Sequence, residues 1–365
     1  TVGEIVAPNK NTRNGSKVDD VASWSIPYVK TPSGFQVTTA KRNTDGAKVK
    51  QAAEIRTGKD EAFNDGKIAS EGVSLLKRLS AQYKEKGKPF FLGVGFTKPH
   101  LPFFAPKRYW DLYDRNDFEP HPFQEAPLNA AKQTINGVVE LHNSYFMETN
   151  VEGAALPLSS EPLPIEQQKE LLHGYYACIS FVDAQVGRLL EALEAQGLRE
   201  STVVVLWSDH GFHLGDHNEW GKHTNLEQAT RCPLIISAPG FSSEGAVTDA
   251  SSQLMDLYPT LCDLAGLPLP EQPLDSESLG GRPLRGRSLR PVLADPTQSV
   301  HRGSISHYNT GGAYGYAIRT ERHRYVEWIS KKHEVVGREL YDYEEDPMET
   351  VNRAGDPDYN SLANK

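Results

Sequence analysis

Apolar residues recur along the chain in two patterns, one typical of helices and one of buried strands. At 64–86, and again at about 165–196, they fall every three or four residues, which places them on one face of a helix. Gly87 and Gly197 follow these segments, where helices commonly end. Unbroken apolar runs, which predict buried strands, lie at 90–96, 203–207 and 233–238.

The alternation of these helices and strands predicts an α/β fold, with a mainly parallel sheet sandwiched by helices. Short alternating segments between residues 302 and 343 predict a small C-terminal antiparallel sheet. The first 60 residues are polar and contain many turn signals. We therefore expect an irregular connecting segment at 1–60, an α/β domain at 61–290 and a small α+β subdomain at 291–365.

Composition limits the kinds of molecule that the protein is expected to bind and the kinds of segment that it contains. The 365 residues carry a formal net charge of −9, which argues against nucleic acid as the main partner. No stretch approaches the ~20 apolar residues of a membrane helix, and residues 1–10 show no apolar core of a signal peptide. Three widely spaced cysteines form no disulfide framework or zinc knuckle and are expected to be buried thiols: Cys178, Cys232 and Cys262.

A first group of candidate residues follows the apolar run at 90–96. In open α/β sheets, ligands bind outside the carboxyl ends of the strands, and Lys98-Pro99-His100 lies at such an end. Pro99 and Pro102 stiffen the turn, as a catalytic imidazole requires. An ordinary surface loop with a single histidine is an equally good interpretation of this segment.

A second group, Asp209-His210-Gly211, follows the apolar run at 203–207. An acid and an imidazole side by side at a strand end can both turn toward one metal ion. The carboxylate suits Ca²⁺ or Mg²⁺, the imidazole suits Zn²⁺, and these two residues alone cannot supply the six to eight ligands of Ca²⁺. The alternative is a turn in which Asp209 caps the next segment.

A third group is the loop at 213–223, which is dense in titratable side chains. Lys222 is the residue we expect to bind an anion, because its ammonium neutralises sulfate or phosphate oxygens. Each histidine of the loop, taken alone, is expected to be solvated. Together the three groups suit hydrolysis of an anionic ester that is held by a metal and by cationic side chains. No cysteine lies in a motif suited to a nucleophile.

Longer runs of the sequence are similar to one known family. The stretch Lys98 to Phe103 (Lys-Pro-His-Leu-Pro-Phe) resembles a segment of calcium-dependent sulfatases of the iduronate-2-sulfatase type, in the alkaline phosphatase superfamily. The stretch Ser208 to His217 resembles their metal-binding strand end. The similarity begins near residue 65, and further matches occur in the same order at 219–222, 229–235, 256–260, 286–289, 339–342 and 346–347.

The resemblance implies a role for each candidate residue. Asp209 and His210 would be ligands of one Ca²⁺ ion, His100 and Lys222 would be catalytic residues that contact the sulfate group, and Lys98 would help to bind the substrate. In this family the nucleophile is a formylglycine made from a Cys-x-Pro-Ser-Arg motif, which this sequence lacks. We expect that motif, and the remaining calcium ligands, in an N-terminal segment that is missing here and is required to complete the fold.

On this interpretation residues 61–290 are the C-terminal portion of a catalytic domain, and the chain alone is inactive and poorly soluble. The expected substrate is a sulfated saccharide, such as a sulfated uronic acid of a glycosaminoglycan. The family resemblance implies a secreted, periplasmic or lysosomal protein. Two alternatives stay open: a metal-dependent phosphatase or phosphodiesterase of the same superfamily, and an inactive homologue that only binds sulfated glycans.

Overall fold

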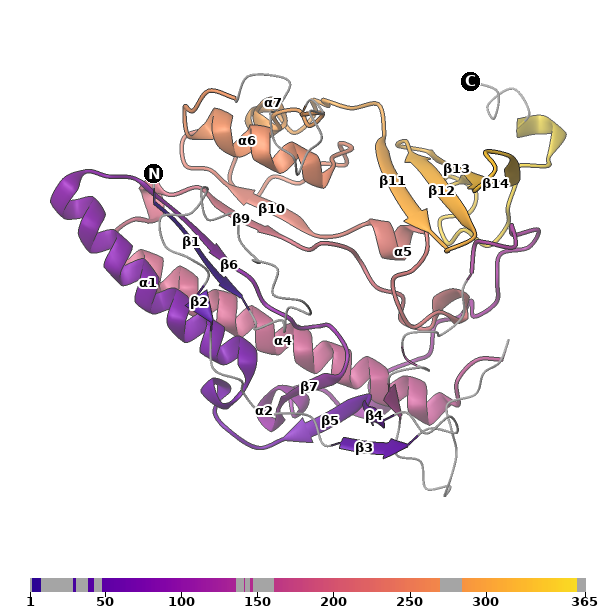
Figure 1. Cartoon of the computed structure of the whole chain (residues 1–365), viewed down its shortest axis with the longest axis horizontal. Coiled ribbons are helices and arrows are strands. Elements are labelled where there is room, and N and C mark those ends of the chain that lie inside the picture. The colour runs from indigo at the N-terminus through magenta and orange to yellow at the C-terminus, as the bar shows by residue number, and fades with distance from the viewer. Residues whose placement is uncertain are drawn as a thin grey trace. The chain divides into compact units, whose positions relative to one another are not determined.

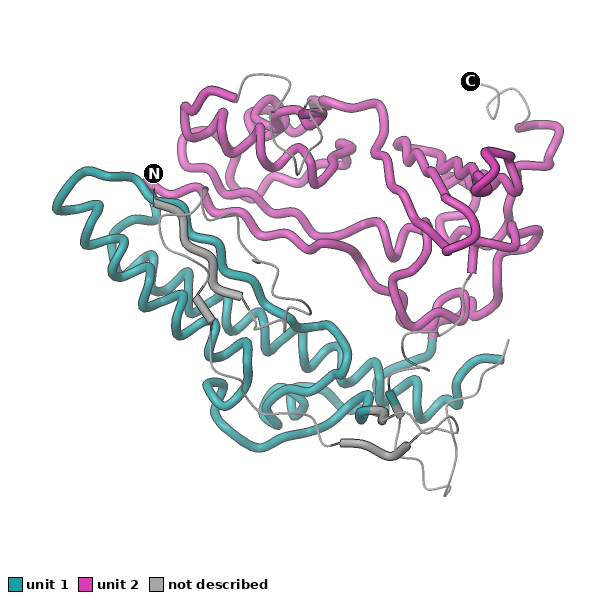
Figure 2. Tube along the Cα trace, in the orientation of Figure 1, with its two compact units in different colours: residues 1–120, 139–200 teal, residues 121–138, 201–365 magenta. Residues whose placement is uncertain are grey.

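The chain divides into two compact units in the computed structural model (Figure 2). One unit comprises residues 1–120 and 139–200, and the other comprises residues 121–138 and 201–365. The structure describes residues 2–7, 29–30, 39–42, 48–135, 141, 145–146, 161–269 and 284–359.

Two long helices form the centre of the first unit (Figure 1). They are α1 (Asn64–Lys86) and α4 (Ile165–Ala195), which pack against each other and confirm the helices predicted from the apolar spacing. Gly87 ends α1 in the left-handed conformation, with φ of 64°, and its N–H donates to the carbonyl of Tyr83. Glycine reaches this conformation without the steric cost that a Cβ brings.

Parallel strands lie beside these helices. The predicted strand at 90–96 is β6 (Phe90–Val94), which pairs with β1 (Val2–Ala7), and β1 pairs with β2 (Val29–Lys30). A second parallel pair joins β5 (Ala53–Arg56) to β7 (Phe103–Pro106). Other elements that the structure describes in this unit are β3 (Thr39–Arg42), β4 (Lys48–Gln51), β8 (Tyr145–Phe146), α2 (Lys107–Trp110), η1 (Asp60–Ala62) and η2 (Arg115–Asp117).

The first 60 residues were expected to be irregular, and among those of them that the structure describes lie the strands β1 to β5. Each has only two to six residues. β3 and β4 are also rich in lysine and arginine, so neither shows the apolar run or strict alternation that identifies a strand from sequence. The pairing of these strands depends on partners elsewhere in the chain: β1 pairs with β6, β5 with β7, and β4 with β8.

In the second unit, β9 (Val204–Trp207) and β10 (Leu234–Ser237) confirm two predicted strands. They pair antiparallel, which differs from the parallel neighbours expected there. The segment between them holds only short helical elements, so it supplies no crossover helix of the kind that parallel neighbours need. The helical elements in the described part of this unit are η4 (Asp216–Asn218), α5 (Glu227–Thr230), η5 (Leu254–Asp256), α6 (Leu257–Leu264), α7 (Arg290–Ala294) and η6 (Pro357–Tyr359). The short helix η3 (Arg199–Ser201) lies where the chain passes from one unit to the other.

The predicted C-terminal antiparallel sheet is confirmed. Its four strands pair in chain order: β11 (Ser304–Asn309), β12 (Ala313–Arg319), β13 (His323–Ser330) and β14 (Val335–Asp342). Trp328 of β13 is fully buried against Ala313, Ala317 and Val326. With its helices, parallel strands and small antiparallel sheet, the chain has the predicted α/β fold class.

The sequence also led to expectations about the burial of the three cysteines and about membrane-spanning helices. All three cysteines are free thiols; Cys178 is buried as expected, whereas Cys232 and Cys262 are partly exposed. Among the helices that the structure describes, none is both long and apolar enough to cross a membrane.

Two glycines of α4 provide a matched test of its packing. A Cβ at Gly174 would lie 2.9 Å from the Phe103 and Trp110 side chains, whereas a Cβ at Gly187 would meet nothing within 4 Å. We expect Gly174→Ala to destabilise the protein by about 1–3 kcal/mol through overpacking. Gly187→Ala should stabilise it by up to about 1 kcal/mol, because alanine is the better helix former. Urea unfolding of both variants measures this, and equal effects would contradict the packing described here.

Candidate functional site

The end of β9 presents a carboxylate and an imidazole side by side. The Asp209 side chain is 84% exposed, and its Oδ2 lies 3.5 Å from Nε2 of His210. Nδ1 of His210 lies 2.7 Å from the carbonyl oxygen of Gly211. Because a carbonyl only accepts hydrogen bonds, Nδ1 carries the proton, and Nε2 of the neutral ring keeps a lone pair. A carboxylate oxygen and an imidazole lone pair at this separation can bind one cation together.

The same turn also contains the capping contact of the alternative interpretation. Oδ1 of Asp209 accepts the backbone N–H of His210 at 3.1 Å and lies 3.4 Å from the Ser208 hydroxyl. This contact orients the carboxylate through one oxygen and leaves Oδ2 directed toward the His210 ring. Capping and cation binding are therefore compatible uses of the two oxygens.

Gly211 is required by the packing of α5 on this turn. Its N–H donates to the carbonyl of Ala229 at 2.8 Å, and a Cβ at Gly211 would lie 2.0 Å from the carbonyl oxygen of Gln228. Only glycine allows so close an approach of two backbones. The position of α5 thus fixes the turn that carries Asp209 and His210.

Lys222 follows a loop that is closed on itself by backbone hydrogen bonds. The N–H of His213 donates to the carbonyl of Gly221 at 2.7 Å, and the N–H of Gly215 donates to that of Glu219 at 2.9 Å. The closure brings the partly buried Lys222 next to the start of the loop, a few residues beyond Asp209 and His210. Lys222, Asp209 and His210 therefore lie on one folded segment of the second unit.

The interior of this loop is a buried triad. His213, Asp216 and His217 are 0%, 3% and 0% exposed. Asp216 Oδ2 interacts with Nδ1 of both rings, and its Oδ1 accepts the N–H of Leu214 at 3.0 Å. The expectation that each histidine of the loop is solvated is wrong for His213 and His217, and only His223 is exposed.

Burial and hydrogen bonding act in opposite directions on the triad. Burial alone disfavours the Asp216 carboxylate, but hydrogen bonds from His213 and His217 outweigh it and hold the pKa of that carboxyl well below its usual range. Burial likewise disfavours a charged His217 ring, and the adjacent Asp216 outweighs it and raises the pKa of His217. The network thus contains a buried, ionised carboxylate that favours protonation of its neighbour.

The triad offers three ligand atoms within 4.8 Å of one another, a spacing that a metal ion could use. Its four ring nitrogens, however, already have protein partners. His213 contacts Asp216 and the Thr224 hydroxyl, and His217 contacts Asp216 and the carbonyl of Glu349. A metal would have to displace these hydrogen bonds, so the contacts favour a structural role, in which the triad holds the loop before Lys222.

Lys98 and His100 lie in a turn of the first unit, after β6. A buried carboxylate that the sequence analysis missed, Asp65 of α1, accepts the backbone N–H groups of Thr97 at 3.0 Å and Lys98 at 2.9 Å. His100 is exposed, and its Nδ1 lies 2.6 Å from the carbonyl of Leu101. As for His210, this contact places the proton of the neutral ring on Nδ1.

The Lys98 ammonium is directed back into its own turn. It donates to the carbonyls of His100 at 2.9 Å and Pro102 at 2.6 Å, and it lies 4.5 Å from the ring centre of Phe104. Burial lowers the pKa of Lys98, although Cys178 and Asp65 oppose this. These contacts give the Lys98 side chain a structural role in the turn. Its contact with a substrate stays a prediction.

The predicted site residues are thus divided between the two units. Asp209, His210 and Lys222 share one segment of the second unit, and Lys98 and His100 share a turn of the first. That the two groups meet around one ligand stays a prediction. Of the residues missed, the triad had a sequence signal in the i, i+3, i+4 spacing of its members, whereas Asp65 lies 32 residues before Thr97 and had none.

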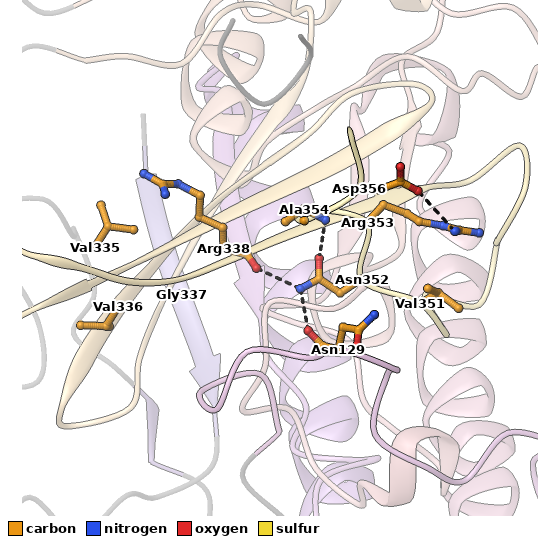
Figure 3. A pocket seen from close by; sticks show the side chains of 11 residues that line it. Asn129, Val335, Val336, Gly337, Arg338, Val351, Asn352, Arg353, Ala354 and Asp356 are labelled. Atoms are coloured by element: carbon orange, nitrogen blue, oxygen red, sulfur yellow. Dashed lines mark hydrogen bonds and ion pairs between the residues drawn. The ribbon is translucent and has the colours of Figure 1, made fainter. Parts of the chain in front are cut away.

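A pocket of about 730 Å³ lies elsewhere in the second unit, beside β14 (Figure 3). Its two arginines already have acidic partners, since Arg338 pairs with Glu327 and Arg353 with Asp356. The Asn352 amide bonds to backbone groups across the pocket floor. The pocket contains no predicted site residue, and its charges are already neutralised.

Comparison with known proteins identifies the family. The sulfatase family model matches residues 46–267, and the model of the C-terminal domain of N-sulphoglucosamine sulphohydrolase matches residues 215–365. The first match covers more than half of the chain. The chain therefore belongs to the sulfatase family, as the motifs around Lys98 and Asp209 predicted.

Individual relatives agree with this assignment. Iduronate 2-sulfatase of Homo sapiens is 27% identical over 417 residues, which cover 98% of this chain and 74% of that enzyme. A solved structure in complex with its substrate D-glucosamine-2-N,6-O-disulfate has a TM-score of 0.68 and 20% identity, and the match covers 100% of this chain and 77% of that one. Phosphonate monoester hydrolase of Agrobacterium radiobacter has a TM-score of 0.68 and 21% identity, with 99% and 75% covered. The two structures show the shared fold.

The buried triad should make stability depend on pH. Because the pKa of Asp216 is lowered, its contribution is present above the ordinary value of 3.8 and is lost as pH falls through the folded pKa. Because the pKa of His217 is raised, its contribution is full below 6.5 and is lost as pH rises through the folded pKa. We expect Asp216→Asn to cost about 3 kcal/mol near pH 6 and to flatten the decline above pH 6.5.

Urea unfolding between pH 4 and pH 9 measures both effects. His223→Gln, which changes an exposed imidazole of the same loop, serves as the control and should keep the wild-type profile. An Asp216→Asn profile parallel to that of the wild type would show that the triad is not the source of the pH dependence.

The Asp65 carboxylate should be needed to order the turn of His100. In the wild type, each carboxylate oxygen of Asp65 accepts one backbone N–H group, from Thr97 or from Lys98. In Asp65→Asn, the single side-chain oxygen replaces only one of these acceptors, and the side-chain NH₂ group faces the other N–H donor. We expect a loss of about 1–3 kcal/mol in stability, from the unsatisfied buried donor. Hydrogen exchange in a peptide spanning 96–104 should become faster.

Asp60→Asn is a suitable control for this variant. Asp60 is also buried in the first unit, but it accepts from the Tyr109 hydroxyl and the Gln185 amide and makes no contact of this kind with the turn. If Asp60→Asn accelerates exchange at 96–104 as much as Asp65→Asn does, the effect comes from general destabilisation.

Proposed function

We propose that the protein is a sulfuric-ester hydrolase that removes sulfate from a sulfated sugar. The observation that supports this most directly is the pair formed by Asp209 Oδ2 and His210 Nε2, 3.5 Å apart at the exposed end of β9. The pair lies in a chain of the sulfatase family, beside a loop that presents Lys222. Sulfatases are in general metal-dependent, and this donor pair fits a cation that accepts both oxygen and nitrogen ligands.

The residues of the chain have distinct proposed roles. Asp209 and His210 supply two ligands for one Ca²⁺ ion, which would neutralise a sulfate oxygen when bound. Lys222 offers a fixed positive charge to a second oxygen of the sulfate group. His100, in its protonated form, donates a hydrogen bond to the same group, and the turn held by Asp65 and Lys98 keeps its ring in place. Within the second unit, Lys222 and a cation bound by Asp209 and His210 would bind different oxygens of one tetrahedral oxyanion.

The nucleophile of this proposal is a formylglycine. The sequence contains no Cys-x-Pro-Ser-Arg motif from which one could be made. Two ligands also fall short of the six to eight oxygen ligands that Ca²⁺ takes. We therefore propose that the nucleophile and the remaining calcium ligands come from a further sulfatase segment, and that these 365 residues bind calcium and sulfate without turning over the ester.

The proposed substrate is a sulfated saccharide of the glycosaminoglycan type. This rests on the likeness to iduronate 2-sulfatase and to the structure with bound D-glucosamine-2-N,6-O-disulfate. A sulfated polysaccharide substrate would place the protein in a secreted, periplasmic or lysosomal setting. The substrate and the setting are both proposals for this chain.

The ligand assignments can be tested by titration. We expect Asp209→Asn to weaken Ca²⁺ binding at least tenfold, equivalent to about 1.4 kcal/mol, because it removes the charged oxygen ligand. Lys222→Ala should weaken binding of inorganic sulfate in the presence of Ca²⁺ by a similar factor, with the Ca²⁺ affinity less affected. Isothermal titration calorimetry measures both affinities. Asp249→Asn, which alters an exposed aspartate of the same unit, is the control.

The outcome separates the proposal from its alternatives. Equal Ca²⁺ affinity in Asp209→Asn and Asp249→Asn would refute the assigned site. Likeness to a phosphonate monoester hydrolase favours one competing function, in which the protein prefers Zn²⁺ and cleaves a phosphonate monoester. Turnover of sulfated sugar against phosphonate monoester, with a formylglycine-bearing segment supplied, decides between them. Saturable glycan binding with turnover of neither ester would identify a binding protein.

A further inference from the structure

A buried glutamate near the C-terminus touches both ends of the segment that carries Lys222. Glu349 follows β14, is 0% exposed and has a φ of 55°. This left-handed conformation is uncommon for a residue other than glycine and indicates that the surroundings determine it. Because a buried carboxylate is costly unless hydrogen-bonded, its partners define what it does.

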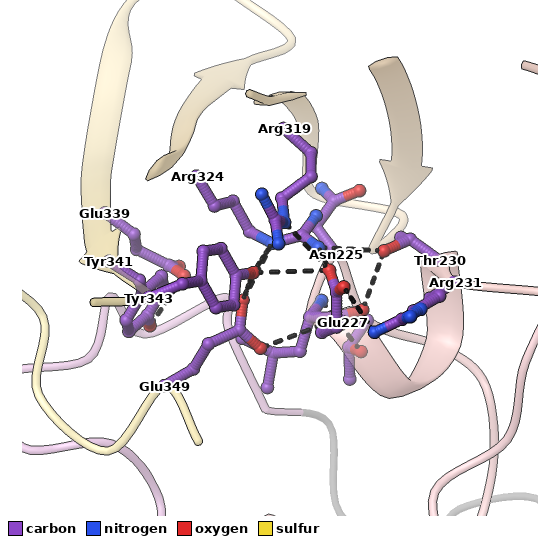
Figure 4. A network of polar contacts seen from close by, with 12 residues as sticks. Asn225, Glu227, Thr230, Arg231, Arg319, Arg324, Glu339, Tyr341, Tyr343 and Glu349 are labelled. Atoms are coloured by element: carbon purple, nitrogen blue, oxygen red, sulfur yellow. Dashed lines mark hydrogen bonds and ion pairs between the residues drawn. The ribbon is translucent and has the colours of Figure 1, made fainter. Parts of the chain in front are cut away.

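The carboxylate of Glu349 joins the C-terminal sheet to α5 (Figure 4). Its Oε1 accepts from Nε of Arg324 at 2.7 Å and from the Tyr343 hydroxyl. Its Oε2 accepts the backbone N–H of Glu227, the first residue of α5, at 2.8 Å. Arg324, itself 1% exposed, also bonds to the Glu227 carboxylate and to Thr230. Both the start and the end of α5 are therefore tied to β13 and the residues around Glu349.

The backbone of Glu349 reaches the other end of the segment. Its carbonyl oxygen lies 3.3 Å from Nε2 of His217, the triad member that also contacts Asp216. One residue thus contacts position 217 through its carbonyl and position 227 through its carboxylate. Lys222 lies midway between these two anchors.

From α5 the restraint continues to the end of β9. The carbonyl of Ala229 accepts the N–H of Gly211, and that of Gln228 lies where a Cβ of Gly211 would be. A displacement of α5 would therefore displace the turn of Asp209 and His210. The chain of contacts from Glu349 therefore reaches Gly211, next to His210, and both ends of the segment that carries Lys222.

We propose that Glu349 is a positioning residue that fixes the cation ligands Asp209 and His210 and the anion-binding Lys222 relative to one another. The relevance to sulfate binding rests on the proposed function, whereas the ordering of segment 209–227 does not. On this view the C-terminal sheet helps to order the site, because Arg324 of β13 and Tyr343, which follows β14, hold Glu349 in place.

The variant Glu349→Gln tests the proposal with little change in shape. The carboxylate of Glu349 accepts on both oxygens, whereas a glutamine amide accepts on one and donates on the other. In either orientation the new NH₂ group faces a donor, either the N–H of Glu227 or the Nε–H of Arg324. We expect hydrogen exchange at 209–227 to accelerate at least tenfold, and Ca²⁺ and sulfate to bind at least tenfold more weakly.

Glu339→Gln is the matched control. Glu339 lies in the same unit, is 1% exposed and accepts from Trp328 Nε1 at 2.7 Å, from the Tyr341 hydroxyl at 3.0 Å and from the Thr134 hydroxyl. These three partners all lie outside segment 209–227. Its variant should lose global stability in urea unfolding, with the exchange of 209–227 and the ligand affinities close to wild type.

Tyr343→Phe is a milder variant for the case in which Glu349→Gln does not fold. It removes one donor to Glu349 and introduces no clash of donors, so the same changes should appear at smaller size. Wild-type exchange at 209–227 in Glu349→Gln or, if it does not fold, in Tyr343→Phe would overturn the proposal, as would equal acceleration in Glu339→Gln. If the wild type binds neither Ca²⁺ nor sulfate, the proposed function fails, and the exchange data still decide whether Glu349 orders the segment.

Discussion

Buried carboxylates that accept backbone N–H groups hold three segments: the turn of His100, the loop before Lys222, and the start of α5, which in turn supports the turn of Asp209 and His210. Asp65 accepts two such groups at the turn of His100, Asp216 accepts one inside the loop before Lys222, and Glu349 accepts one at the start of α5. A carboxylate is an acceptor only, so it satisfies several donors at a point where a loop has no sheet or helix to do so. The cost of burying it makes its geometry demanding, because removal of one partner leaves an unpaired group in a dry interior.

This arrangement explains how irregular segments can support chemistry that needs fixed distances. A group that binds a cation or an oxyanion must be held within about half an ångström by its supporting contacts. In the second unit the support comes from far along the chain, since 132 residues separate His217 from Glu349 and 97 separate Glu227 from Arg324. The C-terminal sheet thus contributes to the site through Arg324 and Glu349, although none of the predicted ligands belongs to it.

The sequence alone predicts those parts of the structure that depend on a local pattern of residues. The helices α1 and α4, the strands β6, β9 and β10 and the C-terminal sheet follow from apolar spacing, and the motifs around Lys98 and Asp209 identify the family. Contacts between residues that are far apart in the sequence cannot be predicted from such local patterns. The burial of His213 and His217 depends on Thr224 and Glu349, the strand β1 is defined by its partner β6, and Asp65 has no motif near the turn that it holds.

The fold itself does not choose the substrate. A structure with a disulfated glucosamine substrate and a phosphonate monoester hydrolase share this fold at the same TM-score of 0.68. A sulfate monoester and a phosphonate monoester each carry one negative charge on a tetrahedral centre, so the proposed binding of the oxyanion by Lys222 and a cation would suit both. Discrimination must come from the choice of metal ligands and from contacts to the leaving group. On the proposed function, the turn of Asp209 and His210 supplies two of the metal ligands, so its support by α5 and Glu349 would bear on the choice of metal as well as on rate.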